Sequence, residues 1–255
     1  MEQIKAIYIH IPFCNTICSY CDFCKMFYNK SLVDSYLREL ANEIKESYKE
    51  GEIATIYIGG GTPTCLSVEQ LSFLFSLLKD IKLTTNYEFT IEANVDSLTE
   101  EKIKLLKNNR VNRISIGVET FNENYQKTIN RKTSYEVLKE KVKLLRENGI
   151  SNINLDLMYG FQNETVTILD KDIDNLLALA IPHISIYSLI LEEHTKLQLD
   201  NYQRLDEDKD QELYKFIEEK LSNAGYKHYE ISNYANEGYE SKHNLVYWNN
   251  EEYYG

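Results

Sequence analysis

Three cysteines near the start of the chain have a spacing that suits iron–sulfur chemistry. Cys14, Cys18 and Cys21 form a C-x3-C-x2-C pattern directly after a short apolar run that predicts a strand. Three thiolates on one loop can hold three irons of a 4Fe-4S cubane, and the fourth iron is then free to bind a small molecule. An open iron suits chemistry rather than storage of an electron alone.

Cys24 leaves a second interpretation open. With it, the pattern C-x3-C-x2-C-x2-C could supply four thiolates to a structural zinc ion. The strand before the motif favours the cluster, and we expect Cys24 to be a packing thiol and not a ligand. Tyr20 could shield the cluster, stack on an adenine or simply pack within the loop.

A run of glycines follows the second predicted strand. Gly59, Gly60 and Gly61 precede Thr62 and Pro63. Such a run lets the backbone approach a ligand and aim N–H or C=O groups at it. The alternative is a tight turn between a strand and a helix. Three glycines followed by Thr-Pro exceed what a turn needs, so the run favours a binding site.

Charged side chains lie at the ends of later predicted strands or just beyond them. These are Glu92, Glu119, Arg131 and Asp156. Each alone could be no more than a solvated surface charge. Together, at one rim, they could hold a ribose diol, an amino group and a carboxylate through paired hydrogen bonds.

One further motif lies near the end of the chain, outside the repeating units. His243 is followed by Tyr247 and Trp248 in the pattern H-N-x-x-Y-W. A neutral imidazole can ligate a haem iron, and neighbouring aromatic rings can cover the porphyrin. The alternative is a histidine that is hydrogen-bonded within a C-terminal cap.

The elements that must position these residues alternate between strand and helix. The predicted strands are Ala6–Ile11, Thr55–Ile58, Glu88–Ala93, Arg113–Val118, Asn152–Met158 and His183–Leu189. The predicted helices are Leu32–Tyr48, Val68–Leu78, Glu100–Lys107, Tyr135–Glu147, Val166–Leu179 and Glu207–Leu221. Their apolar residues recur at three- and four-residue steps.

Six βα units in series predict an α/β fold with a parallel sheet and right-handed crossovers. The sheet could close in part, as an incomplete TIM-like barrel, or lie open as a doubly wound sheet. In both cases function belongs at the carboxyl ends of the strands. The residue pattern agrees, because the cysteines, the glycine run and the charged rim all follow predicted strands. A last strand-like segment, Tyr226–Tyr234, predicts a short β extension.

Composition limits the classes of protein to which the chain can belong. The chain has 255 residues, and 43% of them are apolar. Its net charge is −12 and it has no basic stripe, so we expect no nucleic-acid partner. Neither a signal peptide nor a run of about 20 apolar residues is found, which predicts a soluble, cytoplasmic protein. Four of the five cysteines lie between positions 14 and 24, which favours a metal site over disulfides.

At the level of whole motifs, the chain resembles the radical SAM superfamily. Its wider strings resemble the HemW-type haem chaperones, whose close relatives are the HemN-type oxygen-independent coproporphyrinogen III oxidases. The strings are YIHIPFCNTICSYCDF, GGGTPT, SIGVETF, LDLMYGF, HISIYSLILEE, YEISNYA and HNLVYW. They occur in order from about Ile7 to Gly255, so the resemblance covers nearly the whole chain.

The resemblance implies a partial barrel of six βα units that holds a 4Fe-4S cluster and S-adenosylmethionine. It makes Cys14, Cys18 and Cys21 the cluster ligands. The residues that match the family's S-adenosylmethionine contacts are Tyr8, Gly60, Gly61, Thr62, Glu92, Arg131 and Asp156. Glu119 stands where the family usually has glutamine, which adds a negative charge beside the cofactor. Thr133 stands where the family usually has histidine.

Two functions follow from the resemblance. The first is a chaperone that binds haem and passes it to an acceptor haemoprotein. The alternative is an oxidase that decarboxylates coproporphyrinogen III by radical chemistry. The 13 residues before Cys14, Phe23 in place of a further cysteine, and the His243 motif favour the chaperone. Whether S-adenosylmethionine is cleaved in this role stays open.

The resemblance also implies partners and domain limits. The partners are haem or a porphyrinogen, an acceptor haemoprotein, and an electron donor such as flavodoxin or ferredoxin, with membrane association only through an acceptor. We expect residues 1–225 to form the radical SAM core and residues 226–255 to begin a C-terminal extension. Because family members continue further, we expect this chain to be truncated.

Overall fold

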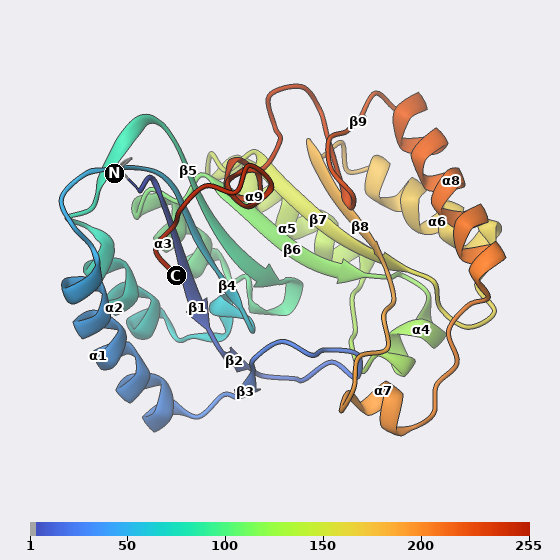
Figure 1. Ribbon diagram of the computed structural model, residues 1–255, viewed down its shortest axis with the longest axis horizontal. Helices are drawn as coiled ribbons and strands as arrows, with labels where there is room; N and C mark the ends of the chain where they lie inside the picture. The colour runs from blue at the N-terminus through green and yellow to red at the C-terminus, as the bar shows by residue number, and fades with distance from the viewer. Residues whose placement is uncertain (1–3) are drawn as a thin grey trace.

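Six parallel strands form the centre of the computed structural model, which describes residues 4–255 (Figure 1). The sheet runs in the order β1-β4-β5-β6-β7-β8-β10-β9. The parallel strands are β1 Ala6–Ile11, β4 Glu52–Gly60, β5 Lys82–Asn94, β6 Arg113–Glu119, β7 Asn152–Tyr159 and β8 His183–Ser188. All six predicted strands are therefore confirmed. Four of them extend beyond the predicted ends, most of all β5.

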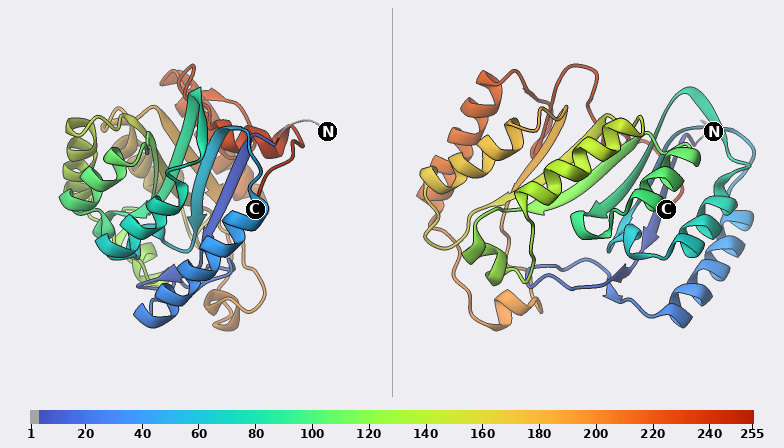
Figure 2. Two further views of the ribbon diagram at one scale, coloured as in Figure 1. Left: turned by 90° about the vertical axis from the view of Figure 1, so that its left-hand side faces the viewer. Right: turned by 180° about the vertical axis from the view of Figure 1, so that it is seen from behind.

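Helices follow the strands and lie on the outer face of the curved sheet (Figure 2). The long ones are α1 Lys30–Ser47, α2 Val68–Leu78, α3 Glu100–Asn108, α5 Tyr135–Glu147, α6 Val166–Leu177 and α8 Glu207–Asn223. Three short helices are α4 Glu123–Thr128, α7 Lys196–Leu199 and α9 Lys242–Trp248. Two 3₁₀ turns are η1 Pro63–Cys65 and η2 Val95–Ser97. The predicted partial barrel is confirmed, since a doubly wound sheet would carry helices on both faces.

Helix α2 illustrates how local sequence sets an element. Ser67 caps its start, because the Ser67 hydroxyl accepts from the backbone N–H of Gln70 at 3.2 Å. The Gln70 side chain in turn accepts from the backbone N–H of Ser67 at 3.0 Å, which completes a capping box. Leu71, Leu74 and Leu78 are at most 1% exposed and pack against the sheet. The helix consequently has the predicted bounds.

One face of the sheet carries aliphatic side chains and the other carries mostly polar ones, and the polar face lines the candidate site. Strand residues that face the helices are aliphatic, and Ile91, Ile114 and Leu155 are each 0% exposed. Alternate residues face the barrel interior and are mostly polar, for example Glu92 and Ser115, which are register partners on neighbouring strands. The strands therefore bury a hydrophobic core on one side and present polar groups on the other.

The C-terminal segment reaches both edges of the sheet. The predicted strand Tyr226–Tyr234 is wrong in detail, because it folds as a hairpin of β9 Lys227–His228 and β10 Asn233–Ala235. Strand β10 pairs with β8 in the antiparallel sense. Further on, Tyr254 lies beside β1, where its carbonyl accepts from the backbone N–H of Tyr8 at 2.7 Å. Between these points α9 lies at the amino ends of the strands (Figure 1).

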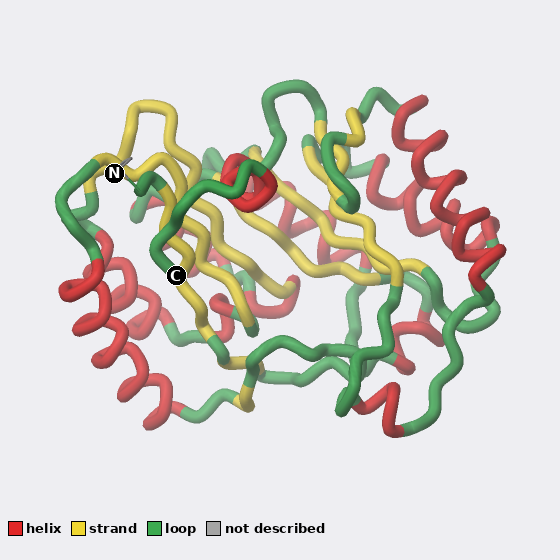
Figure 3. The backbone as a smooth tube through the Cα atoms, viewed as in Figure 1, coloured by secondary structure: helices red, strands yellow, loops and turns green. Residues whose placement is uncertain are grey.

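The cysteine loop lies at the opposite end, beyond the carboxyl ends of the strands. It connects β1 to α1 and contains the short strands β2 Phe13–Cys14 and β3 Met26–Phe27, which pair with each other (Figure 3). Within residues 4–255, the helices are all too short or too polar to cross a lipid bilayer.

Candidate cluster and cofactor site

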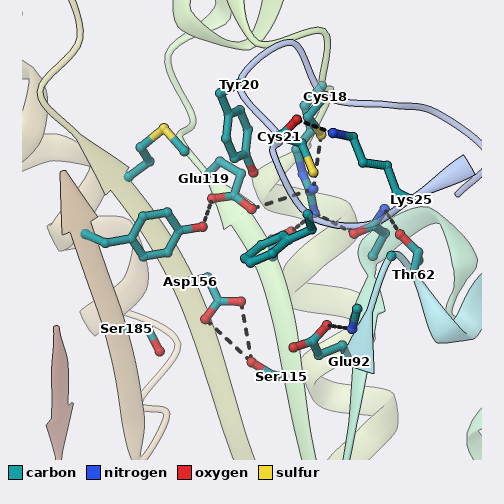
Figure 4. Close-up of a pocket in the computed structure, with 18 of the residues that line it drawn as sticks. Cys18, Tyr20, Cys21, Lys25, Thr62, Glu92, Ser115, Glu119, Asp156 and Ser185 are labelled. Atoms are coloured by element: carbon teal, nitrogen blue, oxygen red, sulfur yellow. Dashed lines mark hydrogen bonds and ion pairs between the residues drawn. The ribbon is translucent and has the colours of Figure 1, made fainter. Parts of the chain in front are cut away.

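A cavity of about 550 Å³ lies inside the barrel and reaches the cysteine loop. Ten of the twelve predicted site residues line it. They are Cys14, Cys18, Cys21, Gly60, Gly61, Thr62, Glu92, Glu119, Arg131 and Asp156. Figure 4 shows Cys18 and Cys21 on one side of this cavity, with Glu92, Glu119 and Asp156 projecting into it from the strands.

Backbone hydrogen bonds fix the cysteine loop against the barrel. The N–H of Met26 donates to the carbonyl of Pro12 at 2.7 Å, and the N–H of Tyr28 donates to the carbonyl of Cys14 at 2.8 Å. Cys14 Sγ also lies 3.7 Å from the hydroxyl of Thr62, which donates to it. These contacts close both ends of the loop, so the three thiols are presented from a defined position.

Burial raises the pKa of all three thiols, at Cys14, Cys18 and Cys21. A buried thiolate without a counter-charge is unfavourable, so the free thiols hold their protons more tightly than exposed cysteines do. Iron would replace these protons on binding, because only the thiolate is a ligand.

The three thiols fit a cluster, because a cubane offers a separate iron to each of three thiolates on one loop. Gly61 leaves the room required beside the thiols, since a Cβ there would lie 3.0 Å from Cys14 Sγ and 2.8 Å from the Phe13 carbonyl.

Cys24 takes no part in this arrangement. Its side chain is exposed and it does not line the cavity. Only its backbone is engaged, because the carbonyl of Cys24 lies 2.8 Å from Nε2 of His10. That Cys24 is not a ligand stays a prediction.

The glycine run supports a carboxylate. Gly60 donates its backbone N–H to Oε2 of Glu92 at 3.0 Å, and Tyr57 donates its hydroxyl to Oε1 at 2.8 Å. Gly60 has a φ of +113°, and a Cβ there would lie 2.6 Å from the ring of His10. The run is therefore more than a tight turn, because its backbone holds Glu92 at the cavity wall.

Burial raises the pKa of Glu92 to about 7, from an ordinary value of 4.5. In the unfolded chain Glu92 ionises near pH 4.5, whereas in the fold it keeps its proton until about pH 7. Its contribution to stability is therefore complete below pH 4.5 and is lost as the pH rises through 7. A bound cation, such as an ammonium group, would favour the ionised form.

We expect Glu92→Gln to flatten the pH dependence of stability in the ligand-free protein. The free energy of unfolding of the wild type should fall, relative to the variant, by up to about 3 kcal/mol between pH 4.5 and 7.5. Denaturant unfolding at several pH values measures this difference. Glu101→Gln, at an exposed position on α3, is the matched control. Parallel curves for wild type and Glu92→Gln would rule out the raised pKa.

Arg131 links the cysteine loop to the charged rim. Its Nη2 donates to Oδ1 of Asn94 and to the carbonyl of Gly117, both at 2.6 Å. Its Nη1 lies 3.7 Å from Cys18 Sγ and 3.6 Å from Oε1 of Glu119. A Cβ at Gly117 would lie 2.5 Å from Nη2 of Arg131, so glycine there makes room for the guanidinium.

Glu119 is held in an unusual backbone conformation. Its φ is +69°, in the left-handed region that residues other than glycine seldom adopt, and the residue is 3% exposed. Oε2 accepts from the hydroxyl of Tyr187 at 2.6 Å. Tyr20 lies against the same carboxylate, and burial together with Glu119 raises the pKa of the Tyr20 phenol. Such strain is typical of functional sites.

Asp156 has neutral partners. It accepts from the amide of Asn154 at 2.6 Å and lies 3.4 Å from the hydroxyl of Ser115. Burial, followed by the charge of Glu119, raises the pKa of Asp156 to about 6. The carboxylate therefore faces the cavity with accepting capacity left for a ligand hydroxyl.

Two predicted site residues do not line the cavity. Tyr8 lies on β1, where its hydroxyl is 3.0 Å from Nδ1 of His10. His243 is 1% exposed at the start of α9, with Nδ1 2.9 Å from the Thr55 hydroxyl and Nε2 2.9 Å from the Tyr247 hydroxyl. Burial lowers the pKa of His243 to about 4, so the ring is neutral.

This position of His243 agrees with the alternative of a histidine that is hydrogen-bonded within the C-terminal segment. To ligate an iron, Nε2 would have to release Tyr247 and the ring would have to leave its buried position. Its assignment as a haem ligand stays a prediction.

Sequence reasoning missed several residues of the cavity wall. They are Tyr57, Arg113, Ser115, Gly117, Asn154, Ser185 and Tyr187. A signal existed for Asn154, because it lies two positions before Asp156 on β7. Residues two apart on a strand point to the same face.

Comparison with known families agrees with this geometry. The family model for the radical SAM superfamily matches residues 8–178. The heme chaperone HemW of Lactococcus lactis subsp. lactis (strain IL1403) is 42% identical over 262 residues, covering 100% of this chain and 68% of that protein. The heme chaperone HemW of Bacillus subtilis (strain 168) is also 42% identical, covering 99% of this chain and 69% of that protein.

Solved structures share the fold. The coproporphyrinogen III oxidase HemN of Escherichia coli, described as a radical SAM enzyme, superposes with a TM-score of 0.86 at 23% identity. That match covers 97% of this chain and 58% of the HemN chain. Streptococcus suis SuiB, solved bound to S-adenosylmethionine, matches with a TM-score of 0.60 at 13% identity, over 86% of this chain and 48% of that one. At these identities the likeness is one of fold alone.

Proposed function

Because the chain belongs to the HemW-type radical SAM family, we propose that it binds a 4Fe-4S cluster, S-adenosylmethionine and haem, and passes haem to an acceptor haemoprotein. The observation that carries the cofactor part is the cavity itself. It gathers three thiols, a glycine-supported carboxylate and a buried guanidinium from segments far apart in the sequence.

In this proposal Cys14, Cys18 and Cys21 hold the cluster. When bound, a reduced cluster supplies an electron that can cleave a carbon–sulfur bond of S-adenosylmethionine. Electrons would come from a donor protein such as flavodoxin or ferredoxin.

The chain's own residues would bind and orient S-adenosylmethionine. Glu92, held by Gly60 and Tyr57, faces the cavity and suits an ammonium group. Arg131 suits a carboxylate, because a guanidinium presents paired donors. Asp156 and Glu119 suit ribose hydroxyls, since ionised carboxylates accept hydrogen bonds.

The haem part rests on the relatives, which are named heme chaperone HemW. The neutral, buried His243 and the exposed rings of Tyr247 and Trp248 are a candidate contact for the porphyrin. Use of His243 as a ligand would require α9 to open, which predicts slow binding.

The experiment is an absorbance titration of the protein with haem, followed by transfer of the haem to an apo-haemoprotein. We expect a haem absorption band in the wild type and a weaker or shifted band in His243→Ala. Trp248→Leu, which removes one ring of the candidate contact but keeps the imidazole of His243, should weaken the band without shifting its position. If the protein gives no haem band but reduced, reconstituted protein converts coproporphyrinogen III, the oxidase function replaces the chaperone function.

A further inference from the structure

Arg113 is a buried cation that none of the functions above uses. It begins β6, lines the cavity, and its side chain is 2% exposed. Within residues 4–255, its Nε is buried without a hydrogen-bond partner. Buried guanidinium groups are normally paired, since burial of an unpaired charge is costly.

The nearest carboxylate is already occupied. Glu88 lies 4.0 Å from Nε of Arg113, which is too far for a hydrogen bond. Its oxygens instead accept from the backbone N–H groups of Lys242 and His243, each at 3.1 Å, and so anchor the start of α9. Glu88 therefore offsets the charge of Arg113 without satisfying its donors.

The other carboxylates near Arg113 also have partners. Glu92 is bound by Tyr57 and Gly60, and Asp156 is bound by Asn154. Neutral groups from β6, β7, β8 and β10 also line the cavity. They are Ser115, Asn154, Ser185 and Asn233. Figure 4 shows Ser115 and Ser185 at the end of the cavity remote from Cys18 and Cys21.

Arg113 lies well away from the cysteine loop. It is four residues before Gly117, whose carbonyl contacts Arg131, so roughly 13 Å of extended strand separates the backbone of Arg113 from that carbonyl. Arg131 lies beside Cys18, whereas Arg113 lies beside Glu88, so the two cations have different neighbours.

Two exposed apolar side chains also line the cavity. Phe23 and Ile190 are 64% and 57% exposed, and the charged Asp22, Lys25 and Glu192 line the cavity as well. A ligand that satisfies both regions needs an apolar body and a negatively charged arm. A tetrapyrrole with propionate side chains has both features.

We propose that Arg113 is the binding site for a carboxylate of the transported ligand, and that this carboxylate is a haem propionate. The identity of the ligand rests on the proposed function, whereas the carboxylate site rests on Arg113 itself. A guanidinium binds a carboxylate through two parallel hydrogen bonds, and a ligand carboxylate would neutralise a charge that Glu88 offsets only from 4.0 Å.

The test compares haem with haem dimethyl ester, in which both propionates are capped, by absorbance titration of the cluster-reconstituted protein. We expect the wild type to bind haem at least about tenfold more tightly than the diester, as loss of a charge-assisted hydrogen bond implies. Arg113→Met should lose this preference, and Arg113→Lys should keep part of it. Arg146→Met, at an exposed position on α5, should behave as the wild type does.

Equal affinity of the wild type for haem and its diester would overturn the inference while leaving the proposed function intact. This comparison uses only the wild type, so it tests the carboxylate site even if Arg113→Met does not fold. Weaker binding of S-adenosylmethionine by Arg113→Met, with the preference for haem unchanged, would assign Arg113 to the cofactor and also overturn the inference. Absence of any haem band in the wild type would reject both the proposed function and the propionate site.

Discussion

Anaerobic reconstitution of Cys18→Ala should leave the protein with almost no iron or sulfide, against about four of each per chain in the wild type. Cys14→Ala and Cys21→Ala should give the same result. Two thiolates leave two irons of a cubane without a protein ligand, and the three cysteines come from one loop that the barrel holds in place. Iron and sulfide assays, together with the visible absorption of the cluster, measure the effect.

Cys24→Ala is the matched control, because it removes a thiol from the same loop. Its side chain is exposed and lies outside the cavity. It should retain the wild-type iron content. A requirement for all four cysteines, with zinc bound in place of iron, would contradict the cluster and restore the zinc alternative.

Arg131→Met should weaken the binding of S-adenosylmethionine by roughly tenfold to a hundredfold, the range expected for loss of hydrogen bonds to a charged group. The substitution also leaves Glu119 without its ion pair at 3.6 Å. Methionine keeps much of the length of the side chain, so the cavity wall should persist. Equilibrium dialysis with labelled cofactor, on variants with full iron content, measures the affinity.

Lys132→Met is the control for this prediction, because it removes the same charge from the next, exposed residue. It should bind the cofactor as the wild type does. An unchanged affinity in Arg131→Met would show that the guanidinium holds only the protein's own groups, Asn94 and Gly117.

Local sequence was sufficient for most of the fold. The apolar spacing of α2 and α5 predicted those helices with the bounds that the structure has, and the capping box that the structure shows at Ser67 explains the start of α2. The carboxyl-end rule for parallel strands then brought the cysteines, glycines and charged residues to one cavity. These inferences succeed because they depend on periodicity and on strand direction, which a sequence carries directly.

Other features depend on contacts between distant segments. Gly117 is needed because the guanidinium of Arg131 packs against its Cα, and the sequence alone does not show this contact. Arg113 looks like any charged residue at the start of a strand, and only the engagement of Glu88 with α9 leaves it unpaired. The environment of His243 likewise depends on Thr55, which lies far away in the sequence.

The most direct test of the central claim is the EPR spectrum of the reduced, reconstituted protein with and without S-adenosylmethionine. If three thiolates leave one iron open to the cavity, addition of the cofactor should change the g-values or the line shape of the cluster signal. The change should saturate with added cofactor and require more of it in Arg131→Met. A spectrum that is identical with and without saturating S-adenosylmethionine would contradict the account.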